Sequence, residues 1–138
     1  MTGNRPYSQI IDRLRNSGLR PTRQRLALAK MLFEGPDRHV TAEMLHSEAL
    51  AADVRVSLAT VYNNLHQFCQ AGLLREIVVD QERAYFDTNL TDHHHFFDDA
   101  TGHLADIPGD QVAFSSLPTA PDGMEVTGVN VVVRVRSR

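Results

Sequence analysis

Capping residues divide the first 72 residues of this 138-residue chain into four short segments. Apolar residues recur at helical spacing over residues 5–17, which include Tyr7, and Gly18 follows where a glycine commonly ends a helix. N-cap residue types stand at the start of the other three segments, at Thr22, Thr41 and Ser57. The pattern therefore predicts helices over residues 5–17, 23–34, 41–51 and 57–71.

Two short β-rich segments follow the fourth predicted helix. Leu74–Val79 and Ala84–Thr88 are separated by the polar turn Asp80–Arg83, which is typical of a β-hairpin. Three helices, a fourth helix and a hairpin in this order predict a winged helix-turn-helix domain over residues 1–88.

The fourth predicted helix has two different faces. A helical wheel places one apolar side at Leu58, Val61, Leu65, Phe68 and Cys69. The opposite side is polar but uncharged, and consists of Ala59, Thr60, Asn63, Asn64, Gln67 and Gln70. Amides and hydroxyls of this kind hydrogen-bond base edges in a DNA major groove. The alternative is an ordinary polar surface helix.

Charge is distributed unevenly along the chain. Residues 1–83 carry 11 Lys/Arg against 9 Asp/Glu, whereas residues 84–138 carry 3 against 8. The first 30 residues alone carry 7 basic and 1 acidic residue. A basic start indicates a part that meets a polyanion such as double-stranded DNA, although a solvated helix face would have the same charge.

The character of the chain changes beyond residue 90. His93–Phe97 and His103–Ile107 are predicted as short strands around Thr101–Gly102, and 126–135 is predicted as a strand with valines along one side. The segment from Pro108 to Gly123 is predicted as loop with at most one short helix. A sheet this small with one apolar face is a poor independent domain, so residues 89–138 are predicted to form a small α/β dimerisation domain. The fold class is then α+β, and a homodimer would present two recognition helices to a palindromic operator.

Several motifs resemble the ferric uptake regulator family. They are the segments 18–25 (GLRPTRQR), 39–43 (HVTAE), 59–65 (ATVYNNL), 70–73 (QAGL), 93–95 (HHH) and 101–103 (TGH), and they occur in the family's order. Within that family, the phrase at 61–68 (VYNNLHQF) and the triple histidine resemble the iron response regulator branch of alpha-proteobacteria. That resemblance implies a haem-responsive transcription factor that acts when iron is scarce.

The sequence also departs from the family pattern. The Cys-X-X-Cys pair that often holds structural zinc is replaced by Asp98 and Thr101, and a second such pair near the C-terminus is missing. Val129 stands near the position where many members carry a histidine, and Asn63 stands where an arginine is common. We therefore expect no structural zinc site and an operator preference that need not match the parent family's.

The histidine cluster offers two chemistries. On a strand, His93 and His95 share a face while His94 points away. The resemblance adds ligand positions in both halves, so the implied metal set is His39, Asp87, His93, His95 and Asp106. Such an N/O set suits Mn2+, Fe2+ or Zn2+. Haem is the second possibility, with His93, His94 and His95 as candidate ligands beside Phe96 and Phe97; a solvated histidine loop that binds nothing is the third.

The predicted DNA contacts fall into two groups. Base edges are assigned to Thr60, Tyr62, Asn63 and Gln67, and phosphates or a groove edge to Arg15, Arg20, Arg23 and Arg25. Tyr62 lies beside the apolar stripe on the wheel, so partial burial is expected there. His46 and His66 are assigned to the surface or to helix packing, and Cys69 to the core.

These patterns predict a dimeric, sequence-specific transcriptional repressor whose DNA binding is controlled by haem. The alternative is a regulator of the same fold that senses Fe2+, Mn2+ or Zn2+ directly. A metal-dependent hydrolase using Asp98 or Asp99 as base, and a haem or metal carrier, explain less, so no enzyme is expected. One cysteine, no apolar run near 20 residues and no secretory signal favour a cytoplasmic protein away from membranes.

Overall fold

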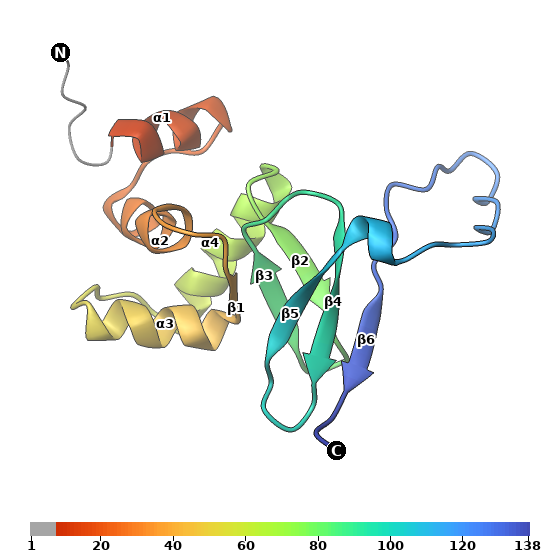
Figure 1. Cartoon of the computed structure of the whole chain (residues 1–138). Helices are drawn as coiled ribbons and strands as arrows, with labels where there is room; N and C mark the ends of the chain where they lie inside the picture. The colour runs from red at the N-terminus through yellow and green to blue at the C-terminus, as the bar shows by residue number, and fades with distance from the viewer. Residues whose placement is uncertain (1–7) are drawn as a thin grey trace, which may run out of the picture. The chain divides into compact units, whose positions relative to one another are not determined.

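The computed structural model describes residues 8–138, and the chain forms two compact units (Figure 1). The first unit ends at Leu90 and the second runs over Thr91–Arg138. Tyr7 and the start of the helix predicted over 5–17 lie outside the described residues.

Four helices make up most of the first unit: α1 (Ser8–Asn16), α2 (Arg23–Phe33), α3 (Ala42–Ala51) and α4 (Leu58–Gln70). The three predicted N-caps are confirmed, because Thr22, Thr41 and Ser57 each accept a hydrogen bond from the backbone N–H three residues on. Gly18 adopts φ 81° after α1, and the N–H of Leu19 donates to the carbonyl of Leu14 at 2.8 Å. This left-handed turn ends the helix as the sequence predicts.

The core of the first unit lies between these helices. Large apolar side chains that are almost completely buried come from all four of them, including Leu14, Leu28, Leu32, Leu45, Val61, Leu65 and Phe68. Those of α4 are the apolar stripe of the helical wheel, with Leu58 and Cys69 half-buried at its edge. The core thus holds α4 with its other side turned outward.

A three-stranded antiparallel sheet completes the first unit. Its strands are β1 (His39–Val40), β2 (Arg75–Val78) and β3 (Ala84–Asp87), in the order β1-β3-β2. The hairpin of β2 and β3 confirms the predicted wing. The sequence did not predict β1, because a two-residue strand is too short to show the alternation that identifies strands.

The second unit is a sheet in the order β5-β4-β6. β4 (His93–Asp98) pairs antiparallel with β5 (Leu104–Pro108) and parallel with β6 (Val132–Val135). A single 3-10 turn, Gly109–Gln111, opens the long loop that leads to β6, as Figure 1 shows. The strands predicted around residues 93–107 and the predicted loop are confirmed.

The last strand is shorter than predicted. Only residues 132–135 of the valine-rich segment 126–135 form a strand, because only these residues pair with β4. Val133 and Val135 are exposed in the single chain, so the sheet of one chain does not bury them. Their burial against a second copy stays a prediction.

Candidate functional site

The polar side of α4 is a surface built by the first unit. Asn63, Gln67 and Gln70 are exposed there, and Thr60 is half-buried. Asn64 differs from the helical-wheel prediction, which placed it on this outer face, since only 6% of the residue is exposed. The buried side chain of Asn64 hydrogen-bonds a residue on another helix. A helical wheel cannot show such a contact, because it considers one helix alone.

That partner is Arg25 on α2, which is half-buried and donates to three acceptors of the first unit. Its Nε donates to Asn64 Oδ1 at 2.9 Å, and one terminal nitrogen donates to the carbonyl of Arg20 at 2.9 Å. The other terminal nitrogen donates to the side-chain oxygen of Gln67. Asn64 in turn donates to the carbonyl of Thr60 at 2.9 Å, which satisfies both ends of its amide.

The remaining predicted DNA contacts are placed as follows. Arg15, Arg20 and Arg23 are exposed. Tyr62 is half-buried, as its position on the wheel indicates, and its hydroxyl donates to Glu43 Oε1 on α3 at 2.8 Å. This hydrogen bond is the main reason why the pKa of Tyr62 lies above its usual value. Sequence reasoning gave Glu43 no role, because the motif at 39–43 does not indicate a contact with α4.

Strand pairing in the first unit brings together two of the predicted metal ligands. His39 on β1 lies opposite Asp87 on β3, and His39 Nε2 is 3.2 Å from Asp87 Oδ2. Asp87 is buried, and its second oxygen accepts the N–H of Asn89 at 2.9 Å. A buried carboxylate held in this way is oriented for an ion pair or for a metal ion.

The second unit holds the other three predicted ligands in one cluster. His93 and His95 lie on the same side of β4 with ring centroids 4.6 Å apart, and Asp106 pairs with His95 across the β4–β5 ladder. Asp106 Oδ1 is 3.4 Å from His93 Nε2 and 3.5 Å from His95 Nε2. The three ligand atoms lie within 4.8 Å of one another, which is compatible with a single ion between them.

A backbone hydrogen bond sets the tautomer of His93. Its Nδ1 lies 2.5 Å from the carbonyl oxygen of Thr91, which can only accept, so Nδ1 carries the proton. The lone pair of the neutral ring is therefore on Nε2, which faces Asp106. Metal-binding histidines commonly have this second contact, because it orients the ring and raises its basicity.

The middle histidine is engaged differently. His94 Nδ1 accepts the backbone N–H of Val131 at 3.1 Å, and the ring packs edge-on against Phe114 with centroids 6.0 Å apart. The proton of the neutral ring then lies on Nε2, the opposite of His93. Phe96 is exposed whereas Phe97 is buried, since neighbouring residues of a strand face opposite sides.

The two residues that replace the expected cysteine pair close the turn between β4 and β5. Asp98 Oδ1 accepts the N–H of Ala100 at 2.9 Å, and Thr101 Oγ1 accepts the N–H of His103 at 3.2 Å. The carbonyl of Asp98 also accepts the N–H of Gly102 at 2.8 Å. Hydrogen bonds of residues 98–103 therefore close this turn.

The other singled-out residues have structural environments. His46 Nε2 forms a hydrogen bond with the carbonyl oxygen of Val56 at 3.0 Å, and this bond joins α3 to the loop before α4. His66 is exposed, and its Nε2 lies 3.6 Å from a carboxylate oxygen of Glu76 on β2. Cys69 is half-buried, and burial is the main reason why its pKa is raised to about 11. A thiol of this kind is a poor nucleophile or ligand.

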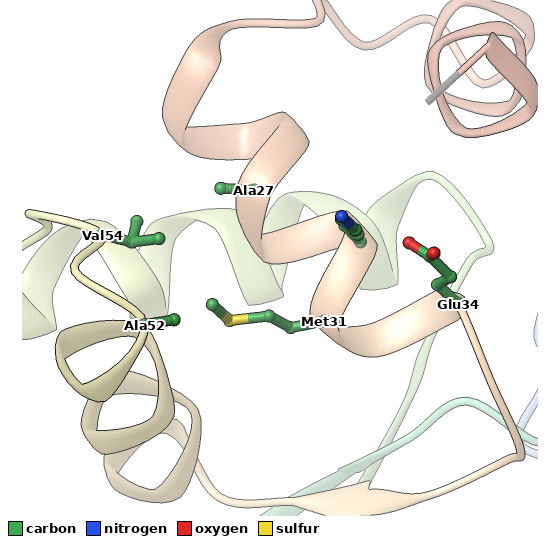
Figure 2. Close-up of a pocket in the computed structure, with 6 residues that line it drawn as sticks. Ala27, Met31, Glu34, Ala52 and Val54 are labelled. Atoms are coloured by element: carbon green, nitrogen blue, oxygen red, sulfur yellow. The ribbon is translucent and has the colours of Figure 1, made fainter. Parts of the chain in front are cut away.

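A pocket of about 460 Å³ lies beside α2 in the first unit. It is lined by Ala27, Lys30, Met31, Glu34, Ala52 and Val54, and Figure 2 shows the Met31 side chain pointing toward Ala52. None of the predicted site residues lines it. Within residues 8–138, no helix has the length and apolar character needed to cross a membrane.

Comparison with known proteins identifies the family. Residues 16–133 match the model of the ferric uptake regulator family. The chain is 40% identical over 81 residues to the ferric uptake regulation protein of Bordetella parapertussis, covering 59% of this chain and 58% of that protein. It is 35% identical over 98 residues to the peroxide-responsive repressor PerR of Staphylococcus saprophyticus, covering 70% of this chain and 65% of that protein.

A solved structure agrees with this assignment. The ferric uptake regulator from Pseudomonas aeruginosa with manganese is 27% identical to the chain, with a TM-score of 0.68 and coverage of 92% of this chain and 96% of that one. The chain therefore belongs to the ferric uptake regulator family, whose members are transcription regulators and not enzymes. The chain spans about three fifths of the length of each of these two curated relatives.

Proposed function

We propose that this chain is a DNA-binding repressor that acts in the cytoplasm as a homodimer on a palindromic operator and responds to a divalent metal ion. The recognition surface is the outward side of α4, with Thr60, Tyr62, Asn63 and Gln67, and phosphate contacts come from the exposed Arg15, Arg20 and Arg23. The proposed ion is Mn2+, Fe2+ or Zn2+, held by His39, Asp87, His93, His95 and Asp106.

The observation that carries this proposal is the cluster on β4 and β5. Two imidazole Nε2 atoms meet one carboxylate oxygen at 3.4 and 3.5 Å, and one of these rings has its lone pair fixed on that side by Thr91. Imidazole and carboxylate together suit a first-row divalent ion. The relative from Pseudomonas aeruginosa that was solved with manganese supports the same class of ion.

The ion would control DNA binding if it were also coordinated by His39 and Asp87 of the first unit. An ion bound by both units would favour one of their relative orientations, and a ligand shifts an equilibrium only by its different affinity for the two states. A tenfold gain in operator affinity requires a coupling of about 1.4 kcal/mol, and operator DNA must then tighten metal binding by the same factor.

The test begins with operator sequences selected from randomised duplex DNA in the presence of Mn2+, Fe2+ under anaerobic conditions, or Zn2+. We expect wild-type protein to bind the selected operator at least tenfold more tightly with metal than after chelation, as measured by fluorescence anisotropy. His95→Ala should remove this metal response, whereas His103→Ala, an exposed histidine nearby, should retain it. Operator binding that is independent of all three metals would refute metal control.

Haem control is the alternative to direct metal sensing, and the motif at 61–68 together with the triple histidine favours it. Haem would use the His93–His95 segment in place of the metal ion, and binding through His94 requires its contact with Val131 to break or its proton to leave Nε2. Replacing His93, His94 and His95 by alanine should then abolish both the haem spectrum and haem-induced release of operator. Release that persists in this triple variant would place the haem site elsewhere.

A further inference from the structure

We propose that Arg25 is a positioning residue for DNA reading: it fixes the amide of Gln67 so that this side chain offers only N–H donors to a base edge, which selects guanine. This inference rests on the proposed function and deepens it by assigning a base preference to one residue of α4. It also replaces the phosphate contact that the sequence predicts for Arg25.

The first step is the fixed position of the guanidinium. Arg25 is half-buried between α2 and α4, and its three donating nitrogens are directed to Asn64, to Gln67 and to the carbonyl of Arg20. Asn64 is itself buried and bonded at both ends. An arginine held at three points inside its own chain is poorly placed to reach a phosphate, unlike the exposed Arg23 two residues earlier.

The second step is the orientation of the Gln67 amide. A guanidinium has donors and no acceptor, so only the amide oxygen of Gln67 can face it. The amide nitrogen, attached to the same planar carbon, then points away from the guanidinium with its two hydrogens. Gln67 is exposed and lies one turn from Asn63 on α4, so this nitrogen belongs to the recognition surface.

The third step is the base that fits such a group. Glutamine normally reads adenine with both ends of the amide, accepting from N6 and donating to N7. With its oxygen turned toward Arg25, Gln67 presents its N–H donors to a base in place of the accepting half of that pattern. The major-groove edge of guanine presents two acceptors, N7 and O6, and cytosine presents a donor that an amide N–H cannot satisfy. Guanine is therefore the base that two outward N–H donors favour.

The experiment measures base preference and salt dependence for the same full-length variants. DNA is selected from a randomised duplex library by wild-type protein loaded with Mn2+, and each variant is then tested on the four possible bases at the position that responds to Gln67. We expect Arg25→Met to lower the guanine-over-adenine ratio at that position by about tenfold or more, with the slope of log affinity against log salt unchanged. Arg23→Met, the matched control on the same helix, should reduce the slope by about one unit and leave the base ratio unchanged.

A second variant keeps the test decisive if Arg25→Met fails to fold. Gln67→Glu retains acceptors for Arg25 and removes both N–H donors, so the guanine preference should be lost and cytosine gained through its N4 donor. An unchanged guanine preference in Gln67→Glu, or an Arg25→Met variant that only loses salt slope, would overturn the inference and leave the proposed function standing. If wild-type protein selects no sequence at all, the proposed function fails and this inference fails with it.

Discussion

At the scale of single residues, Asn63 is the simplest test of the recognition surface. It is exposed on α4, and its amide can form a bidentate contact with a base. We expect Asn63→Ala to lose about 1–3 kcal/mol of discrimination between operator and random DNA. Anisotropy titrations on both DNAs measure this, and equal losses on the two would remove the base-reading role.

Cys69 gives a residue-scale prediction about chemical reactivity. Its pKa is raised to about 11, first by burial and second by the charge of Glu76, so the thiol form is favoured at neutral pH. Against an ordinary thiol with a pKa of about 8.5, the thiolate fraction is lower by roughly 300-fold. Native protein at pH 7.5 should react with a disulfide reagent at least 100-fold more slowly than denatured protein does.

The rate with native protein should rise about tenfold per pH unit up to pH 11, which follows from the same titration. Cys69→Ala provides the blank. Rapid modification of native protein at pH 7.5, accompanied by loss of operator binding, would instead show that Cys69 is a reactive thiol.

At the scale of elements, the wing turn depends on one carboxylate. Asp80 Oδ1 accepts the N–H groups of Glu82 and Arg83 at 2.9 Å each, and Oδ2 accepts from the Arg83 side chain. The hydrogen bond from Arg83 is the main reason why the pKa of Asp80 lies below its usual value. A depressed carboxyl pKa contributes stability above about pH 4, and this contribution is lost as pH falls through the lower folded-state pKa.

We therefore expect Asp80→Ala to speed amide hydrogen exchange at Glu82 and Arg83 at pH 7 while leaving the exchange of the helices unchanged. In wild-type protein the same two amides should lose protection only below about pH 4. Equal protection in the two proteins at pH 7 would show that the backbone holds the wing turn without the carboxylate.

The elements also show which parts of the structure a sequence determines locally. The helices were predictable because Thr22, Thr41 and Ser57 cap them within three residues of sequence. The role of Asn64 was not, because its partner Arg25 is 39 residues away in the chain. The strand at 132–135 was overestimated because valine periodicity continues beyond the residues that pair with β4.

The candidate metal cluster lies between these cases. Strand periodicity brings His93 and His95 together, as the sequence indicates. The partner Asp106 depends on the register of β4 with β5, which periodicity alone does not fix and which the family resemblance supplied.

At the scale of the whole molecule, we expect a dimer that does not depend on metal. Phe96 and Val133 are register partners on β4 and β6, with 40% and 38% of each residue exposed, which leaves an apolar surface for a second copy. Exhaustive chelation should leave the dimer intact in size-exclusion chromatography with light scattering, because residues 98–103 hold their turn without thiolates.

Val133→Asp should instead give a monomer, because it places a charge within this apolar surface. Val78→Asp is the matched control, since Val78 is an equally apolar residue exposed on the wing of the first unit. Dissociation of wild-type protein on chelation would reveal a metal ion that holds the two copies together.

The turn closed by Asp98 and Thr101 has a consequence for how such a receptor can work. In a protein whose corresponding turn depended on a thiolate-bound zinc ion, an oxidant or a shortage of zinc would disrupt the turn as well as the sensing of the other metal. Here neither agent has a bond to attack in that turn. If the proposed ion at His93, His95 and Asp106 is gained or lost, the hydrogen bonds of this turn are unaffected, so the turn does not have to reform each time the receptor changes state.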